Sequence, residues 1–139
     1  MKKVILLFCA IAGMALLAAC QKEPQKPVAP AAPVLWTSSD TPSRVEYRRL
    51  WEYSAQGETE DPARIREIVE AVKALAVGEE DPSATDDFTD VLVFSFPQGE
   101  PLQLEFENQS WVTPEGTRFH VEGLARLRAA LDPLIAETE

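Results

Sequence analysis

The chain has 139 residues, of which 45% are hydrophobic and 26% charged, and its formal net charge is −10 at pH 7. This length suits one small domain, and the acidic balance argues against nucleic acid and anionic lipid surfaces as partners, because both would repel it. With two cysteines and one histidine, the chain offers few zinc ligands and little support for serine–histidine or cysteine–histidine catalysis.

The N-terminal segment has the layout of a signal peptide. Lys2 and Lys3 precede an uncharged apolar run of 16 residues over 4–19. As a helix at ~1.5 Å per residue this run spans about 24 Å, which is short for a hydrocarbon core of ~30 Å. A permanent transmembrane helix is therefore the less favoured interpretation.

The run closes on Leu17-Ala18-Ala19-Cys20, with small residues directly before a cysteine. This stretch resembles the lipobox of bacterial lipoproteins. The resemblance implies cleavage before Cys20 and a diacylglyceryl thioether on its sulfur, commonly with a third acyl chain such as palmitate on its amine. At ~0.8 kcal/mol per buried CH₂, two or three chains make a stable membrane anchor. The alternative is an ordinary secretory signal in which Cys20 is an incidental thiol.

The same resemblance implies a location. Gln21 follows the cysteine, whereas aspartate there favours retention in the inner membrane of Gram-negative bacteria. We therefore expect a lipid-anchored protein of the cell envelope, in the outer membrane if the organism is Gram-negative, with the periplasmic face favoured.

Cleavage would remove residues 1–19, with two lysines and no acidic residue, and so leave 120 residues with 11 basic and 23 acidic side chains, a net charge of −12. Cys9 would be lost as well, which leaves no disulfide in the mature domain. Pro24, Pro27, Pro30 and Pro33 are spaced three apart and would line one edge of a polyproline II helix, which has three residues per turn. We expect a lipidated cysteine and tether over 20–35, with a Pro-rich recognition ligand as the alternative, and one domain over 36–139.

The first half of that domain alternates and then becomes helical. Alternation over 44–54 predicts a half-buried strand, although Arg49 falls on its apolar side and suggests a bulge near residues 48–50. A loop is expected over 56–60. Asp61 as N-cap, Pro62 and apolar residues at spacings of three and four predict a helix over about 62–77, ended by Gly78. An acidic loop is expected over 79–90.

The second half predicts a meander and a last helix. Residues 91–96 are apolar on both faces, as in a central strand, and 102–107 should form an antiparallel hairpin with them. Short strands are expected over 110–113 and 117–121. An amphipathic helix begins near Gly123 and should bend or restart at Asp132-Pro133. The predicted fold class is α+β, an antiparallel β-meander with two helices packed on one face, in the order β-α-β-β-β-β-α.

Catalytic motifs are absent from the sequence. It has no Gly-x-Ser-x-Gly and no Ser-x-x-Lys, and His120 is expected on the polar face beside Arg118. We assign no catalytic residue and no cofactor, and a hydrolase with paired carboxylates stays an alternative. So does calcium, which needs only oxygen ligands, although EF-hand spacing is missing. The calcium candidates are Glu79, Glu80, Asp81, Asp86, Asp87 and Asp90.

The remaining candidate surface is the sheet face turned away from the helices. Arg44, Glu46 and Arg48 could meet polar and charged residues of the later strands there, as ion pairs where both side chains are charged. The candidates are Gln103, Glu105, Glu107, Arg118 and His120. The alternative is a partner-binding face formed by Arg48, Trp51, Glu105, Trp111, Arg118 and His120. We expect a non-enzymatic accessory or binding module for a protein or peptide, which the net charge suggests is cationic, and no nucleic-acid partner.

Overall fold

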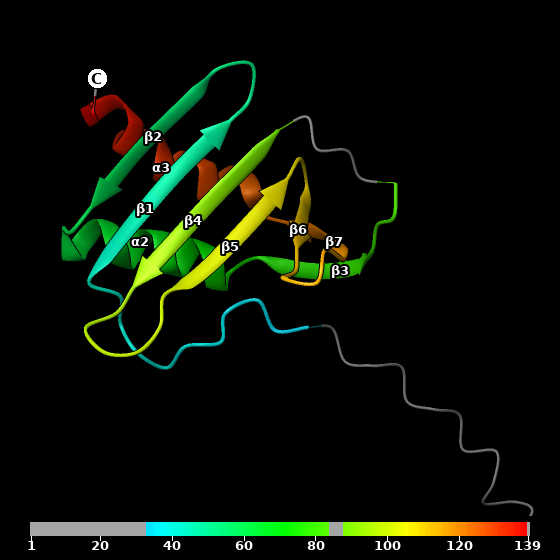
Figure 1. Cartoon of the computed structure of the whole chain (residues 1–139), viewed down its shortest axis with the longest axis horizontal. Helices are drawn as coiled ribbons and strands as arrows, with labels where there is room; N and C mark the ends of the chain where they lie inside the picture. The colour runs from blue at the N-terminus through cyan, green and yellow to red at the C-terminus, as the bar shows by residue number, and fades with distance from the viewer. Residues whose placement is uncertain (1–32, 84–87, 139) are drawn as a thin grey trace, which may run out of the picture. The chain divides into compact units, whose positions relative to one another are not determined.

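The computed structural model describes residues 33–83 and 88–138 (Figure 1). The predicted signal peptide, Cys20 and almost all of the predicted tether lie outside the described residues. Neither described helix has the length and the apolar run that crossing a bilayer requires.

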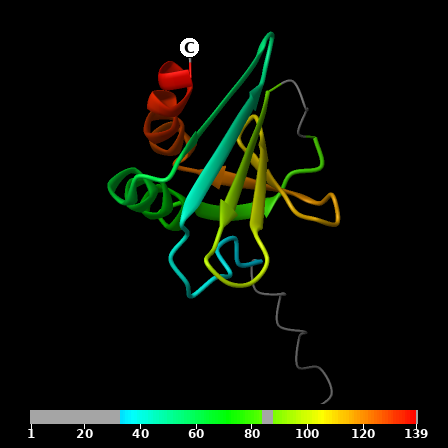
Figure 2. The same cartoon turned by 60° about the vertical axis from the view of Figure 1, so that its left-hand side comes forward.

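Within the described residues, seven strands form one antiparallel sheet and two helices cover one of its faces (Figures 1 and 2). The strands are β1 (Arg44–Leu50), β2 (Ser54–Thr59), β3 (Ala76–Glu80), β4 (Thr89–Ser95), β5 (Leu102–Glu107), β6 (Ser110–Val112) and β7 (Arg118–Glu122). The helices are α2 (Pro62–Lys73) and α3 (Leu124–Thr138). The predicted α+β class is confirmed, and the predicted elements occur in the predicted order, with β2 and β3 added to them.

The sheet order is β2-β1-β4-β5-β6-β7-β3, so the meander runs from β4 to β7. The predicted hairpin of β4 and β5 is confirmed by antiparallel pairing from Thr89↔Glu107 to Phe94↔Leu102. β4 lies between β1 and β5, so the predicted central position is confirmed; its Leu92 and Phe94 are buried in the core, whereas Val91 and Val93 are half-buried on the opposite face.

The core fills the space between the sheet and the helices. Every second residue of a strand points to the same face, so the alternating strands each bring an apolar row inward. Helices α2 and α3 close this layer with apolar side chains at helical spacing. The core includes Val45, Tyr47, Leu92, Phe94, Leu104, Phe106, Ile65, Ile68, Leu127 and Leu131.

The loop expected over 56–60 is instead strand β2, at one edge of the sheet and paired with β1 from Val45↔Thr59 to Leu50↔Ser54. Its sequence, Ser-Ala-Gln-Gly-Glu-Thr, has no large apolar residue. The strand can do without one because α3 packs directly on its inner face, where Gly57 and Thr59 are buried. The predicted bulge near residues 48–50 is wrong as well, because β1 keeps one register with β2 and with β4.

Helix α2 begins as predicted and ends earlier than predicted. The Asp61 carboxylate accepts a hydrogen bond from the Ala63 amide at 3.1 Å, with Pro62 at the first helical position. Ala74 caps the C-terminal end, and residues 76–80 form strand β3 beside β7. Gly78 is therefore part of a strand and does not end a helix. As a strand, residues 76–80 form backbone hydrogen bonds with β7. If the helix continued through them, that edge of β7 would lose these partners.

Helix α3 continues through Pro133, so the predicted restart at that residue is wrong. Leu131 and Leu134 are both fully buried on either side of the proline. Burial of this apolar stripe offsets the hydrogen bond that proline cannot donate.

The folded domain begins before residue 36. Leu35 is buried in the core, and the Trp36 ring meets Phe94 edge-on with 5.0 Å between ring centroids. The Lys73 ammonium lies 5.7 Å from the centroid of the Trp36 ring. The segment that leads into β1 is therefore anchored against the core and against α2.

Candidate functional site

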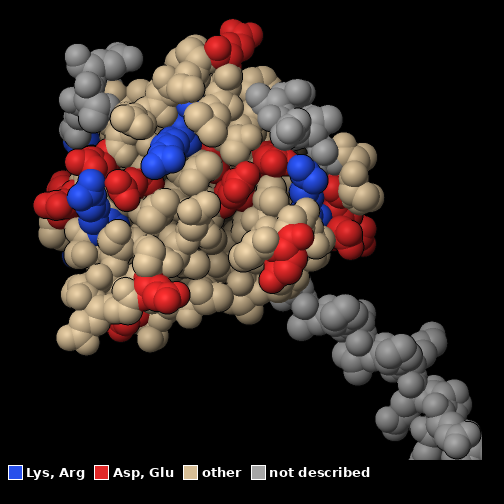
Figure 3. All heavy atoms as spheres, viewed as in Figure 1, with Lys and Arg blue, Asp and Glu red and all other residues tan. Residues whose placement is uncertain are grey.

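We call the sheet face that the helices leave uncovered the outer face (Figure 2). The strand registers place five of its residues in one row that crosses β1, β4, β5, β6 and β7. This central row consists of Arg48, Val91, Glu105, Val112 and Arg118. Figure 3 views the outer face. Basic and acidic side chains lie next to each other in groups there, and uncharged surface separates the groups.

Two groups of ion pairs lie on this face, one beside the central row and one that includes Arg118 of the row. Arg44 bridges Glu46 and Glu58. Across the short strand β6, Arg118 Nε donates to Glu107 Oε2 at 2.5 Å. Because β4 separates β1 from β5, residues of β1 are not cross-strand neighbours of β5 or β7, and the predicted cross-strand ion pairs between them are not formed among the described residues.

The middle of the central row is different. Arg48 is exposed and Glu105 is half-buried, and neither forms an ion pair with the part of the chain that the structure describes. Glu105 stands between the half-buried Val91 and Val112. Next to this position, a shallow hollow is lined by Gln103, Glu105, Val112, Thr113, Pro114 and Gly116. The row thus presents the Glu105 carboxylate between two valines, and the Arg48 guanidinium two strands away, each without an ion-pair partner among the described residues.

Of the six candidate partner-face residues, the structure brings Arg48, Glu105 and Arg118 together in the central row and places His120 in the neighbouring row, opposite Ser110. The two tryptophans do not belong to this face. Trp111 is only 5% exposed and packs inward against Phe119, since it occupies the alternate position of its strand.

A buried ion-pair network, not foreseen from the sequence, lies on the inner face where β1, β4 and α3 meet. Asp90 is 2% exposed and accepts hydrogen bonds from the Tyr47 hydroxyl at 2.5 Å and from Arg128 Nε at 2.9 Å. Arg49 donates from Nε to the Tyr47 hydroxyl at 2.8 Å and from Nη2 to Asp132 at 2.7 Å. This network explains why Arg49 occupies an inward position without a bulge.

The network favours structure over proton transfer. Burial and the hydrogen bond to Asp90 raise the pKa of the Tyr47 hydroxyl, which therefore keeps its proton. Burial lowers the pKa of Arg49, but its hydrogen bonds to Asp132 and Tyr47 outweigh that effect and the pKa is raised. The only sequence signal for this site was a single charged residue on the apolar side of a strand.

Above the network, the connection of β1 to β2 carries large apolar side chains. The Trp51 ring lies 4.5 Å from the guanidinium carbon of Arg49, 5.7 Å from that of Arg128, and 5.3 Å, between ring centroids, from Phe88. Leu50, Tyr53 and Phe88 are 44%, 66% and 42% exposed. We call Leu50, Trp51, Tyr53 and Phe88 the aromatic tip.

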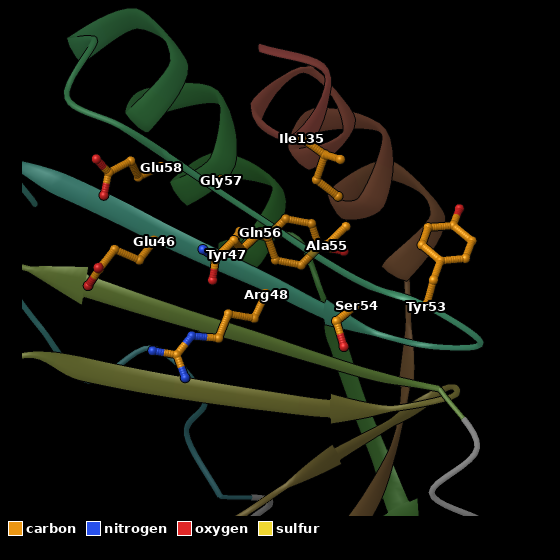
Figure 4. A pocket seen from close by; sticks show the side chains of 10 residues that line it. All are labelled: Glu46, Tyr47, Arg48, Tyr53, Ser54, Ala55, Gln56, Gly57, Glu58 and Ile135. Atoms are coloured by element: carbon orange, nitrogen blue, oxygen red, sulfur yellow. The ribbon is translucent and has the colours of Figure 1, made fainter. Parts of the chain in front are cut away.

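A pocket runs along β1 and β2 between the outer face and Ile135 of α3 (Figure 4). It contains two carboxylates, Glu46 and Glu58, which face each other across the two strands. Both are bound by Arg44, and their side chains are 43% and 55% exposed. A glycosidase pair needs one carboxyl in an apolar setting that keeps it protonated, and this pocket offers neither carboxylate such a setting.

The calcium candidates that can be placed do not gather in one loop. Glu79 and Glu80 belong to β3, whereas Asp90 belongs to β4 and is bound by Arg128; three strands separate β3 from β4. Asp81 accepts hydrogen bonds from the Ser83 amide and hydroxyl. Asp86 and Asp87 lie outside the described residues. Within the described part of the chain, no group of three or more His, Cys, Asp or Glu residues could hold a metal ion.

Comparisons of the chain with protein-family models, with curated proteins and with solved structures find no match. A function is therefore inferred from the residues of the chain itself.

Proposed function

We propose that the protein is a non-enzymatic lipoprotein of the bacterial cell envelope, anchored through acyl chains on Cys20, whose folded domain binds a protein or peptide partner through the outer face. The signal-peptide layout and the lipobox resemblance support the anchor. The observation that carries the binding role is the central row, in which a half-buried carboxylate and an exposed guanidinium are left without a described partner.

The composition of the outer face suits a reversible interface. Such interfaces combine apolar contacts with charged groups and are about as apolar as the rest of the surface. Val91 and Val112 supply half-buried apolar contacts on either side of Glu105. A partner can pair with Arg48 and Glu105 without first breaking an ion pair inside the domain.

The charge favours a cationic partner. The processed chain would carry a net charge of −12, which raises the association rate of a basic partner through long-range attraction. A lysine or arginine placed over Glu105 would find a carboxylate flanked by Val91 and Val112, so its aliphatic stem could pack while its charge is paired.

The anchor is tested in the native host by metabolic labelling with palmitate and by the mass of the N-terminal peptide. Wild-type protein should carry the label, begin at Cys20 and fractionate with the outer membrane if the organism is Gram-negative. Cys20→Ala should lose the label. A label that persists in Cys20→Ala would contradict lipidation at this residue.

The binding face is tested with two charge-swapped variants of equal net charge. Arg48→Glu with Glu105→Arg reverses the charges of the central row, and Arg66→Glu with Glu70→Arg does the same on the exposed side of α2. Full-length tagged protein is purified from the native envelope in mild detergent, and co-purifying proteins are quantified by mass spectrometry. The α2 variant should co-purify as much partner as the wild type does. The central-row variant should co-purify at least ten times less. Equal retention by both variants would contradict binding through the outer face.

A further inference from the structure

The aromatic tip exposes large apolar side chains to solvent instead of burying them in the core. Leu50, Tyr53 and Phe88 are the most exposed large apolar residues within the two strand-end segments that meet there, at 44%, 66% and 42%. Leu50 pairs with Thr89, the residue after Phe88, so both segments lie at the same end of the sheet. Clustered exposed apolar side chains of this kind mark interaction sites more often than scattered ones do.

Trp51 and Phe88 join the aromatic tip to the buried network. Trp51 contacts Phe88 and the guanidinium groups of Arg49 and Arg128, and both arginines belong to the network around Asp90. The Phe88 carbonyl also accepts a hydrogen bond from the Asn108 amide at 2.8 Å. A fixed aromatic side chain loses little conformational entropy when a partner packs on it.

The charge at the aromatic tip discriminates between partners. Glu52 lies between Trp51 and Tyr53, is exposed, and forms no ion pair with the described residues. Insertion into a bilayer would bring this carboxylate into the interface at a cost. Two tips facing each other would oppose two Glu52 carboxylates on two strongly acidic chains, which disfavours a second copy as the occupant.

We propose that the aromatic tip is a second docking element, distinct from the outer face, and that it inserts into an apolar cleft bordered by a basic side chain on a protein partner. Leu50, Tyr53 and Phe88 supply the inserted surface, and Glu52 pairs with the basic group. Trp51 is the positioning residue that joins the aromatic tip to the network. This inference rests on the proposed function in one respect, that the domain binds protein.

The proposal is tested by placing a photo-crosslinking phenylalanine analogue at Tyr53 in the full-length protein, in the native host. The control position is Gln98, an exposed residue in the connection of β4 to β5, at the opposite end of β4. Tyr53 should give one discrete protein adduct after irradiation, and Gln98 should not. Glu52→Lys should reduce the adduct at least fivefold, whereas Glu100→Lys, also exposed and in that connection, should leave it unchanged.

Mass spectrometry of the adduct decides among the occupants. A cross-linked peptide that contains apolar residues and a lysine or arginine supports the proposal. An adduct with phospholipid, an adduct with a second copy, an equal adduct from Gln98, an adduct insensitive to Glu52→Lys, or no discrete adduct would each overturn it. If the central-row variant still loses its partner in those cases, the proposed function stands and the inference about the aromatic tip fails alone.

Discussion

The backbone of Gly57 in β2 lies so close to Leu134 in α3 that a Cβ atom added to Gly57 would stand 2.4 Å from the Leu134 carbonyl oxygen. The contact is backbone to backbone, and neither partner can rotate away. It explains how an edge strand without large apolar residues can still be covered by a helix, because the absence of a side chain is what admits α3.

Gly57→Ala should therefore lower the free energy of unfolding by about 2 kcal/mol or more, since the added methyl group must push α3 away from β2. Gly78→Ala is the matched control in another edge strand, where the nearest atom to an added Cβ is 3.4 Å away. That variant should change stability by no more than about 0.5 kcal/mol. Urea denaturation of the two purified variants measures both effects, and equal stability would show that the close approach is not maintained in solution.

Asp90→Asn should lower the free energy of unfolding by about 3 kcal/mol. The substitution removes the negative charge that Arg128 and Arg49 share in the buried network. Arg49 keeps its pair with Asp132, but the Arg128 guanidinium loses its carboxylate partner among the described residues. The contrasting variant is Asp132→Asn, whose carboxylate is 60% exposed in its pair with Arg49. Because an exposed ion pair contributes little, its cost should stay below about 1 kcal/mol. A cost at Asp90 as small as that at Asp132 would argue against a buried network.

Stability should fall above about pH 10, and Tyr47 is the reason. The folded-state pKa of Tyr47 is raised above its ordinary value of 10.0, so the folded state holds this proton more tightly than the unfolded state. The resulting stabilisation is complete below pH 10 and is lost as the pH rises above it. Denaturation midpoints measured from pH 7 to 11 should decline steeply at the alkaline end for wild type and less steeply for Tyr47→Phe. Parallel declines would exclude Tyr47 as the source.

Pro133→Ala should stabilise the protein. Pro133 is exposed and lies inside α3, where it removes a hydrogen bond from the helix and crowds the preceding turn. Alanine restores the donor and should raise the melting temperature by about 4–8 °C, corresponding to roughly 1 kcal/mol in a domain of this size. Calorimetry measures the shift. A lower melting temperature would mean that the proline ring makes a packing contribution larger than the missing hydrogen bond.

Local patterns in the sequence predicted the parts of the fold that local chemistry determines. The Asp61-Pro62 start of α2 depends on a side chain that caps its own helix, and the alternation of Leu102 to Glu107 depends on one buried face. Both were therefore visible without long-range information. The same holds for the central position of residues 91–96.

Strands β2 and β3 were missed because their signals come from distant residues. Gly57 in β2 is explained only by Leu134, 77 positions along the chain. In β3, Ala76 and Val77 continue the apolar spacing of α2, and only their pairing with Glu122 and Val121 makes them a strand. Arg49 is a third case, since Asp90 and Asp132 come from elements far from it in sequence.

The sheet is open, and its edge strand β3 has features that discourage pairing with another chain. β3 forms one edge and carries Glu79 and Glu80, with a register shift against β7 between Val77 and Glu80. Charges and an irregular register on an edge strand oppose the addition of a foreign strand and so limit aggregation. Glu79 and Glu80, two of the calcium candidates from the sequence, thus lie where they would oppose edge-to-edge polymerisation of copies of this protein held at high local concentration.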